Sequence, residues 1–216
     1  MKTRSTPKTK TETITDFMLA EYQTSAENRL HEIERGQSYV NLFLTITSGA
    51  AALIVLVGQN ASPSFYFVSV WILFLLLLLG IVSFIRVIER DIRITRHGRS
   101  MNRLRRYFAE IEPNVGRYLS YSTHDDTPKY ASKGRDRIGL RSVVSLINNS
   151  VGATLAYLIT PKLWGANIGI IVATITFVLM LALHELYASM SWRKAEKQST
   201  IRFPSGSTKS PKGRIK

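Results

Sequence analysis

"SFYFVSVWILFLLLLLGIVSFI", residues 64–85, contains no charged side chain, and this stretch decides the fold class of the chain. At a helical rise of about 1.5 Å per residue, a helix of this length crosses the ~30 Å hydrocarbon core of a bilayer. A buried helix of a soluble protein needs neither this length nor apolar side chains on every face. We therefore interpret residues 64–85 as a transmembrane helix.

Three further apolar stretches accompany it. Residues 39–58 ("YVNLFLTITSGAAALIVLVG") also lack charge, and residues 166–188 ("ANIGIIVATITFVLMLALHELYA") are long enough to span a bilayer. Residues 143–160 are shorter and carry Asn148 and Asn149, so hydropathy alone does not decide whether they span. The distribution of charge has to decide this point.

The net charge is +14, and the basic residues are concentrated in three segments, with six Lys and Arg in 1–37, fourteen in 86–142 and eight in 189–216. The short links 59–63 and 161–165 contain a single basic residue, Lys162. If residues 143–160 did not span, the basic C-terminal segment and the basic middle segment would lie on opposite sides, against the positive-inside rule. We therefore expect an all-α integral membrane protein with four transmembrane helices in two hairpins. It would lie in the plasma (inner) membrane with both termini cytoplasmic.

Helical patterns also extend outside the apolar stretches. Residues 13–36 form an amphipathic pattern that opens with Thr13 and Asp16 in capping-box spacing, and we expect this helix to end near Gly36. The segment 86–142 continues at helical spacing to about residue 111, before Pro113, and then reads as a linker. The acidic first helix should pair antiparallel with this basic one. The basic tails 1–12 and 189–216 are expected to be disordered.

Five arginines lie close together in "RHGRSMNRLRRYF" (96–108), at Arg96, Arg99, Arg103, Arg105 and Arg106. They can mark the cytoplasmic side and attract the anionic headgroups of the lipid bilayer. They can also bind a specific cytoplasmic anionic ligand or protein partner through bidentate hydrogen bonds. Pairing with the acidic helix 13–36 is a third use, and binding of nucleic acid is a weaker hypothesis because no nucleic-acid-binding motif accompanies them.

Polar and small residues within the spans form two further sets of candidates. The first set serves helix packing, including self-association into a homo-oligomer, or lines a pore: Ser145, Asn148, Asn149, Gly165, Gly169 and Ala173. The second set, His184 and Glu185, either forms an ionisable relay or reaches interfacial water at the end of the last span.

Motifs of enzymatic chemistry are not found in the sequence. The chain has no cysteine, and its four histidines are scattered without the spacing of a metal site. We expect no cofactor, no metal site and no enzymatic activity. The favoured function is a multi-pass membrane interaction or sensing module whose basic cytoplasmic surface binds an anionic partner. A pore-forming or membrane-perturbing effector gated by its cytoplasmic helices is the alternative, and a membrane-anchored nucleic-acid binder is a weaker one.

Overall fold

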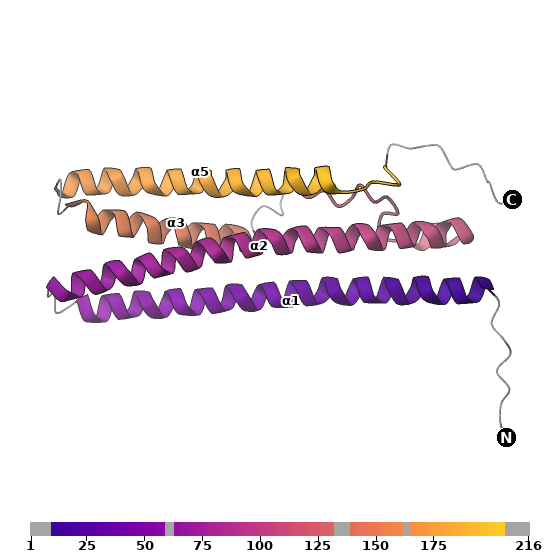
Figure 1. The fold of residues 1–216 in the computed structure, drawn as a ribbon, viewed down its shortest axis with the longest axis horizontal. Coiled ribbons are helices and arrows are strands. Elements are labelled where there is room, and N and C mark those ends of the chain that lie inside the picture. The colour runs from indigo at the N-terminus through magenta and orange to yellow at the C-terminus, as the bar shows by residue number, and fades with distance from the viewer. Residues whose placement is uncertain (1–9, 59–62, 132–138, 162–164, 206–216) are drawn as a thin grey trace, which may run out of the picture. The chain divides into compact units, whose positions relative to one another are not determined.

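The computed structural model describes residues 10–58, 63–131, 139–161 and 165–205, and within these ranges it contains helices and no strands. Four α-helices are present there: α1 (Lys10–Gly58), α2 (Pro63–Ile111), α3 (Leu140–Ile159) and α5 (Ala166–Gln198). Figure 1 labels these four helices, and a short 3-10 helix, η1 (Val115–Tyr118), follows α2. Each of the four α-helices is long and apolar enough to cross a membrane, as the sequence predicted.

The ends of α2 follow simple rules of backbone chemistry. The helix begins at Pro63, because a proline at the first helical position gives up no hydrogen bond that the helix would otherwise make. It ends at Ile111, two residues before Pro113, which disfavours the helical conformation of the residue before it. The end predicted from the sequence agrees with this observation.

The expected end of the first helix near Gly36 was wrong, because α1 continues without a break to Gly58. A glycine inside a helix costs roughly 0.5 to 1 kcal/mol relative to alanine, which made a helix end plausible. In the structure the Arg90 side chain lies directly against Gly36, where a Cβ atom would collide with it. Gly36 is therefore explained by a close approach of α2 to α1.

The chain divides into two compact units, and α1 and α2 contribute to both. We call the described parts of residues 33–92 and 130–198 the apolar unit. We call the described parts of the remaining chain, residues 10–32, 93–129 and 199–205, the arginine unit.

All four α-helices supply side chains to the core of the apolar unit. Its main cluster is buried and consists of Val40, Phe43, Phe84, Val87, Ile88, Val144 and Ala188. A second cluster joins α2 to α3 and consists of Leu73, Leu76 and Val151. Many other apolar side chains of the same helices are exposed, among them Leu56, Phe67 and Ile171. The core is therefore small relative to the apolar content of this unit.

The segments expected to be disordered are partly ordered. Helix α5 continues beyond residue 188 to Gln198, so the first ten residues of the segment 189–216 are helical and not disordered. Residues 199–205 are also described and form specific hydrogen bonds. At the other end, helix α1 already begins at Lys10, within the tail 1–12. Residues 1–9 and 206–216, and Lys162 in the second link, lie outside the described residues.

Candidate functional site

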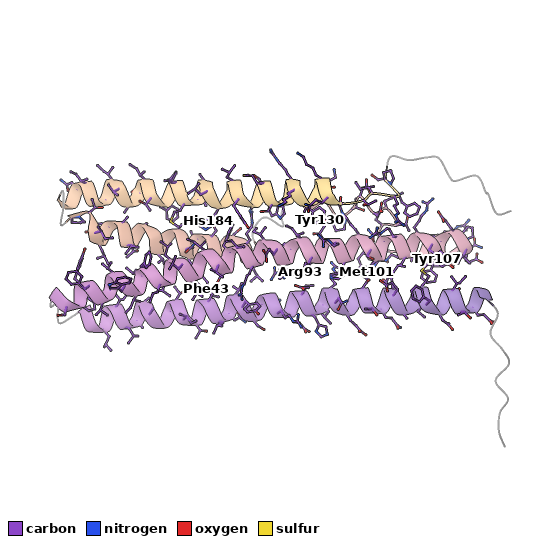
Figure 2. The ribbon with its side chains drawn as sticks, in the orientation of Figure 1. Phe43, Arg93, Met101, Tyr107, Tyr130 and His184 are labelled. Atoms are coloured by element: carbon purple, nitrogen blue, oxygen red, sulfur yellow. The ribbon has the colours of Figure 1, made fainter. Side chains whose placement is uncertain are left out.

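In the arginine unit, the first and second helices pair antiparallel, as the charge pattern predicted. Arg93 Nε of α2 lies 3.0 Å from Glu32 Oε1 of α1, and further along α2 the Arg105 Nη2 donates to Tyr22 Oη at 2.9 Å. The residue numbers of the contacts on α1 therefore fall as those on α2 rise, as expected for two antiparallel helices. Met101 of α2 is buried in this unit (Figure 2). The acidic and basic helices therefore share one packed interface.

The five candidate arginines of α2 differ strongly in exposure. Arg96 is exposed and Arg103 is half-buried, and neither makes a hydrogen bond or ion pair with another described residue. Arg105 donates to Asn102 Oδ1 at 2.6 Å, and its guanidinium lies over the Tyr121 ring at 4.7 Å. The remaining two, Arg99 and Arg106, contact other segments of the unit. The sequence cluster is therefore divided into structural and accessible arginines.

Arg99 is the most buried of the five, with 4% of its surface exposed, because it holds the loop 122–128 on α2. Its Nε donates to the Pro128 carbonyl oxygen at 2.9 Å. One turn further, Asn102 Nδ2 donates to the carbonyl oxygens of His124 at 3.0 Å and Thr127 at 2.8 Å. Sequence reasoning did not identify Asn102, because a polar residue among arginines resembles any exposed helix face.

The same loop uses its two carboxylates to hold the segment 199–205. The Asp125 side chain, 1% exposed, accepts backbone N–H bonds from Arg202 at 3.0 Å and from Phe203 at 2.8 Å. The next carboxylate, that of Asp126, accepts from the Ser205 backbone nitrogen at 3.0 Å and from its hydroxyl at 2.6 Å. The hydrogen bond from the Ser205 hydroxyl lowers the pKa of Asp126 below its ordinary value.

Segment 199–205 also contacts two of the candidate arginines directly. Arg99 Nη1 donates to the Ser199 hydroxyl at 3.0 Å. The Arg106 guanidinium lies 5.9 Å from the centre of the Phe203 ring, and Arg106 Nε forms a 2.7 Å ion pair with Glu110. The arginine unit is thus assembled from four sequence regions, 10–32, 93–111, the loop 122–128 and 199–205.

In the apolar unit, a separate polar cluster joins α3 to α5. Asn148 Nδ2 lies 3.1 Å from His184 Nε2, and His184 Nδ1 lies 2.8 Å from the Met180 carbonyl oxygen. An amide nitrogen only donates and a carbonyl oxygen only accepts, so Nε2 is the acceptor and Nδ1 carries the donated proton. The Phe84 ring of α2 packs edge-on against the imidazole, with 4.3 Å between ring centroids.

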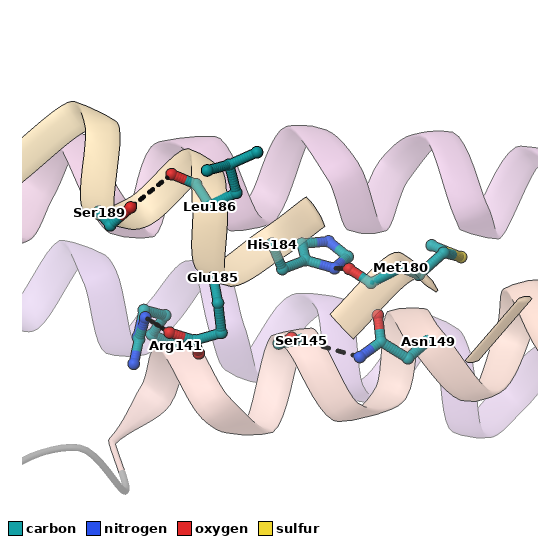
Figure 3. A network of polar contacts seen from close by, with 8 residues as sticks. All are labelled: Arg141, Ser145, Asn149, Met180, His184, Glu185, Leu186 and Ser189. Atoms are coloured by element: carbon teal, nitrogen blue, oxygen red, sulfur yellow. Dashed lines mark hydrogen bonds and ion pairs between the residues drawn. The ribbon is translucent and has the colours of Figure 1, made fainter. Parts of the chain in front are cut away.

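Gly80 of α2 provides the space for the Asn148 amide. A Cβ atom at residue 80 would collide with the Asn148 amide oxygen and carbon, so only glycine permits this approach. Asn148 Oδ1 and Asn149 Oδ1 are buried and accept no hydrogen bond from a described residue. The Asn149 amide nitrogen lies 3.5 Å from the Ser145 hydroxyl on the same helix (Figure 3). These three side chains of α3, at residues 145, 148 and 149, are therefore internal to the unit.

The two ionisable residues of α5 face different partners. Figure 3 shows His184 beside the Met180 carbonyl group, whereas Glu185 extends to Arg141 of α3. Arg141 Nη1 lies 3.1 Å from Glu185 Oε2, and the Arg141 guanidinium lies 4.8 Å from the centre of the Trp192 ring. The Glu185 side chain is 57% exposed. His184 and Glu185 are adjacent in the sequence but contact different side chains of α3, Asn148 and Arg141 respectively.

The small residues predicted at the start of the last span also differ from one another. Gly165 precedes α5 with a φ of 92°, a left-handed backbone conformation that favours glycine. Gly169 is buried, and a Cβ atom there would meet the Pro161 side chain at 2.8 Å. Ala173 is half-buried. Part of this predicted groove is thus filled within the same chain by Pro161, which follows α3.

No metal-binding group of three or more His, Asp or Glu side chains occurs among the described residues. Comparison of the chain with protein-family models, curated proteins and solved structures finds no match. The geometry of the arginine unit and of the polar cluster therefore has to carry the functional argument.

Proposed function

We propose that this chain is a multi-pass membrane protein of non-catalytic type with four spans in two hairpins, located in the plasma (inner) membrane. The exposed apolar side chains on its four long helices support contact with lipid, because water-soluble units rarely leave so many of them uncovered. The concentration of Lys and Arg in 1–37, 86–142 and 189–216 supports cytoplasmic locations for both termini and for the segment between the hairpins.

Within this protein, the arginine unit is proposed to act as an interaction or sensing module for an anionic partner. The observation that carries the proposal is the division of the arginines, since Arg99 and Arg105 are fixed by internal contacts while Arg96 is exposed and Arg103 is half-buried. Residues 96 and 103 are separated by seven positions and therefore lie on one face of α2. A folded unit that presents arginines in fixed positions loses less entropy on binding than a disordered basic tail does.

The experiment measures binding of tripolyphosphate, a soluble probe with clustered phosphates, to the full chain in neutral-lipid nanodiscs. The Arg96→Gln/Arg103→Gln variant should bind at least about tenfold more weakly, because each lost charge-assisted hydrogen bond is worth roughly 1.5 to 3 kcal/mol. Arg193→Gln/Lys194→Gln is the matched control, since it removes the same charge from two exposed residues of α5. Equal weakening by both variants would reduce the effect to net charge and contradict the proposal.

The polar cluster supports a role in helix packing better than it supports the alternative function, a pore-forming effector gated by its cytoplasmic helices. Asn148 and Asn149 are 0% exposed within a single chain, whereas residues that line a pore must face water. Their burial between helices supports a role in helix packing, where polar side chains join neighbouring spans. A membrane-anchored nucleic-acid binder is also less supported, because Arg99 and Arg105 are engaged within the unit.

Self-association remains part of the proposal, and the small residues of α1 support it better than those of α5. Gly169 is covered within the chain, but Gly49 of α1 is exposed, and a Cβ atom added there would meet no atom within 4 Å. Thr45, Ser48 and Ala52 are exposed around it. Small residues at this spacing allow two helices to approach closely in a membrane. A Gly49→Leu variant should therefore reduce dimer formation measured by energy transfer between labelled copies.

A further inference from the structure

The segment 199–205 contacts two of the candidate arginines of α2, Arg99 and Arg106. Its first residue receives a hydrogen bond from Arg99 Nη1, and its Phe203 ring faces the Arg106 guanidinium. Residues 99 and 106 are separated by seven positions and thus lie on one helix face, as residues 96 and 103 do. All four belong to one row along the helix, with successive members three or four residues apart. The segment therefore covers two arginines of the row that also contains the exposed Arg96.

The segment is held mainly through its backbone and two hydroxyls, those of Ser199 and Ser205. Asp125 accepts the N–H groups of Arg202 and Phe203, and its own N–H donates to the Phe203 carbonyl oxygen at 3.2 Å. Asp126 accepts both donors of Ser205. Water can satisfy these same backbone groups when the segment leaves. Arg202 and Ser205 are already exposed, so release uncovers little additional apolar surface apart from the Phe203 ring.

We infer that the segment 199–205 is an intramolecular cover of the arginine row, and that a phosphate-bearing partner binds in competition with it. This inference rests on the proposed function and adds its regulation. Release would free Arg99 Nη1 from a neutral hydroxyl and Arg106 from the Phe203 ring. Guanidinium groups form shorter and stronger hydrogen bonds with charged phosphate oxygens than with neutral acceptors. The partner thus gains Arg99 Nη1 and the face of the Arg106 guanidinium that Phe203 covers, while Arg99 Nε still donates to Pro128 and Arg106 Nε still pairs with Glu110.

The absence of native cysteine allows a direct test in the full chain. In an Asp126→Cys/Ser205→Cys variant the two thiols replace groups whose oxygen atoms lie 2.6 Å apart, so oxidation should lock the segment in place. Tripolyphosphate binding is measured in neutral-lipid nanodiscs before and after reduction. We expect the oxidised form to bind about tenfold more weakly than the reduced form, and Ser205→Cys alone to be insensitive to the oxidant.

A second variant tests the same inference without a cross-link. Phe203→Ala removes the ring that faces Arg106 but keeps the backbone hydrogen bonds to Asp125, so binding of tripolyphosphate should tighten several-fold.

Repeating the measurement with anionic lipid in the nanodiscs identifies the source of phosphate. If anionic lipid weakens tripolyphosphate binding to the reduced Asp126→Cys/Ser205→Cys variant, the site is assigned to lipid headgroups. If tripolyphosphate binds as tightly as in neutral lipid, the site is assigned to a soluble partner.

Two results would overturn the inference, and they are distinguishable. Equal binding by the oxidised and reduced forms would mean that the segment covers no binding surface, while the proposed anionic-partner function would stand. Absence of binding in both forms and in Phe203→Ala would refute the proposed function, and the competition with it.

Discussion

The hydrogen bond between Asn148 of α3 and His184 of α5 leads to a quantitative prediction for helix association. The two nitrogens lie 3.1 Å apart, and both side chains are buried. Hydrogen bonds between membrane helices contribute about 0.6 kcal/mol on average and up to about 1.7 kcal/mol. We expect a coupling free energy near the upper value, because truncating Asn148 leaves His184 Nε2 without its donor inside an apolar unit.

The assay is a double-mutant cycle with Asn148→Ala, His184→Ala and the double variant. The free energy of unfolding is measured by titrating the reconstituted protein with denaturing detergent and following tryptophan fluorescence. Each single variant should cost more than the coupling alone, about 2 kcal/mol or more, because truncation of a buried side chain also leaves a cavity. The double variant should then be less destabilised than the sum of the two single variants by about 1 to 1.7 kcal/mol.

A matched control cycle pairs Asn148→Ala with Thr174→Ala. Thr174 lies on the same helix as His184, but its side chain is exposed and donates to the Ile170 carbonyl oxygen of its own helix at 2.9 Å. Those two substitutions should be additive within about 0.3 to 0.5 kcal/mol. If the Asn148 and His184 substitutions are equally additive, the hydrogen bond contributes nothing to helix association and the reasoning is refuted.

Two further predictions concern Gly80 and Asp126. Gly80→Ala should destabilise the protein by about 1 to 3 kcal/mol, because its Cβ atom would collide with the Asn148 amide, whereas Gly49→Ala should be neutral or stabilising in the same detergent titration. The Ser205 hydroxyl holds the pKa of Asp126 below the ordinary value of 3.8. The charged form of Asp126 therefore contributes fully to the free energy of unfolding at pH values above 3.8. This contribution is lost as the pH falls through the lowered pKa of Asp126. A Ser205→Ala variant should raise that pKa toward 3.8 in a carboxyl NMR titration. An unchanged pKa would contradict the role of the Ser205 hydroxyl.

Local sequence patterns were sufficient to predict three of the four apolar helices and the end of α2, whereas the span at residues 143–160 was predicted only from the charge distribution along the whole chain. The length of each apolar stretch is a local property, and Pro113 acts on its immediate neighbours. The expected helix end at Gly36 failed because a local rule for glycine cannot anticipate Arg90, which lies 54 positions later in the sequence. Packing between helices, and not backbone preference, decides the residue at this position.

The candidate arginines show the same limit more strongly. Their positive charges predicted a solvated or ligand-binding surface, and Arg96 is indeed exposed. Arg99 is buried because the loop 122–128 and Ser199 reach it, and these groups lie roughly 30 and 100 positions away in the sequence. No periodicity within α2 encodes such contacts. The polar character of α3 was visible in Asn148, but its partner His184 could be identified only from the structure.

Under the proposed membrane topology, the low hydropathy of α3 has a consequence for the insertion of this helix. Helix α3 is the least apolar of the four helices, and Ser145, Asn148 and Asn149 interrupt its apolar side chains. Alone at the translocon, α3 would present its asparagines and Arg141 to lipid and should partition poorly. Once α5 is synthesised, His184 and Glu185 offer partners to these groups. We therefore expect the third and fourth spans to integrate together as one hairpin, so that a nascent chain arrested before α5 leaves the third span outside the bilayer.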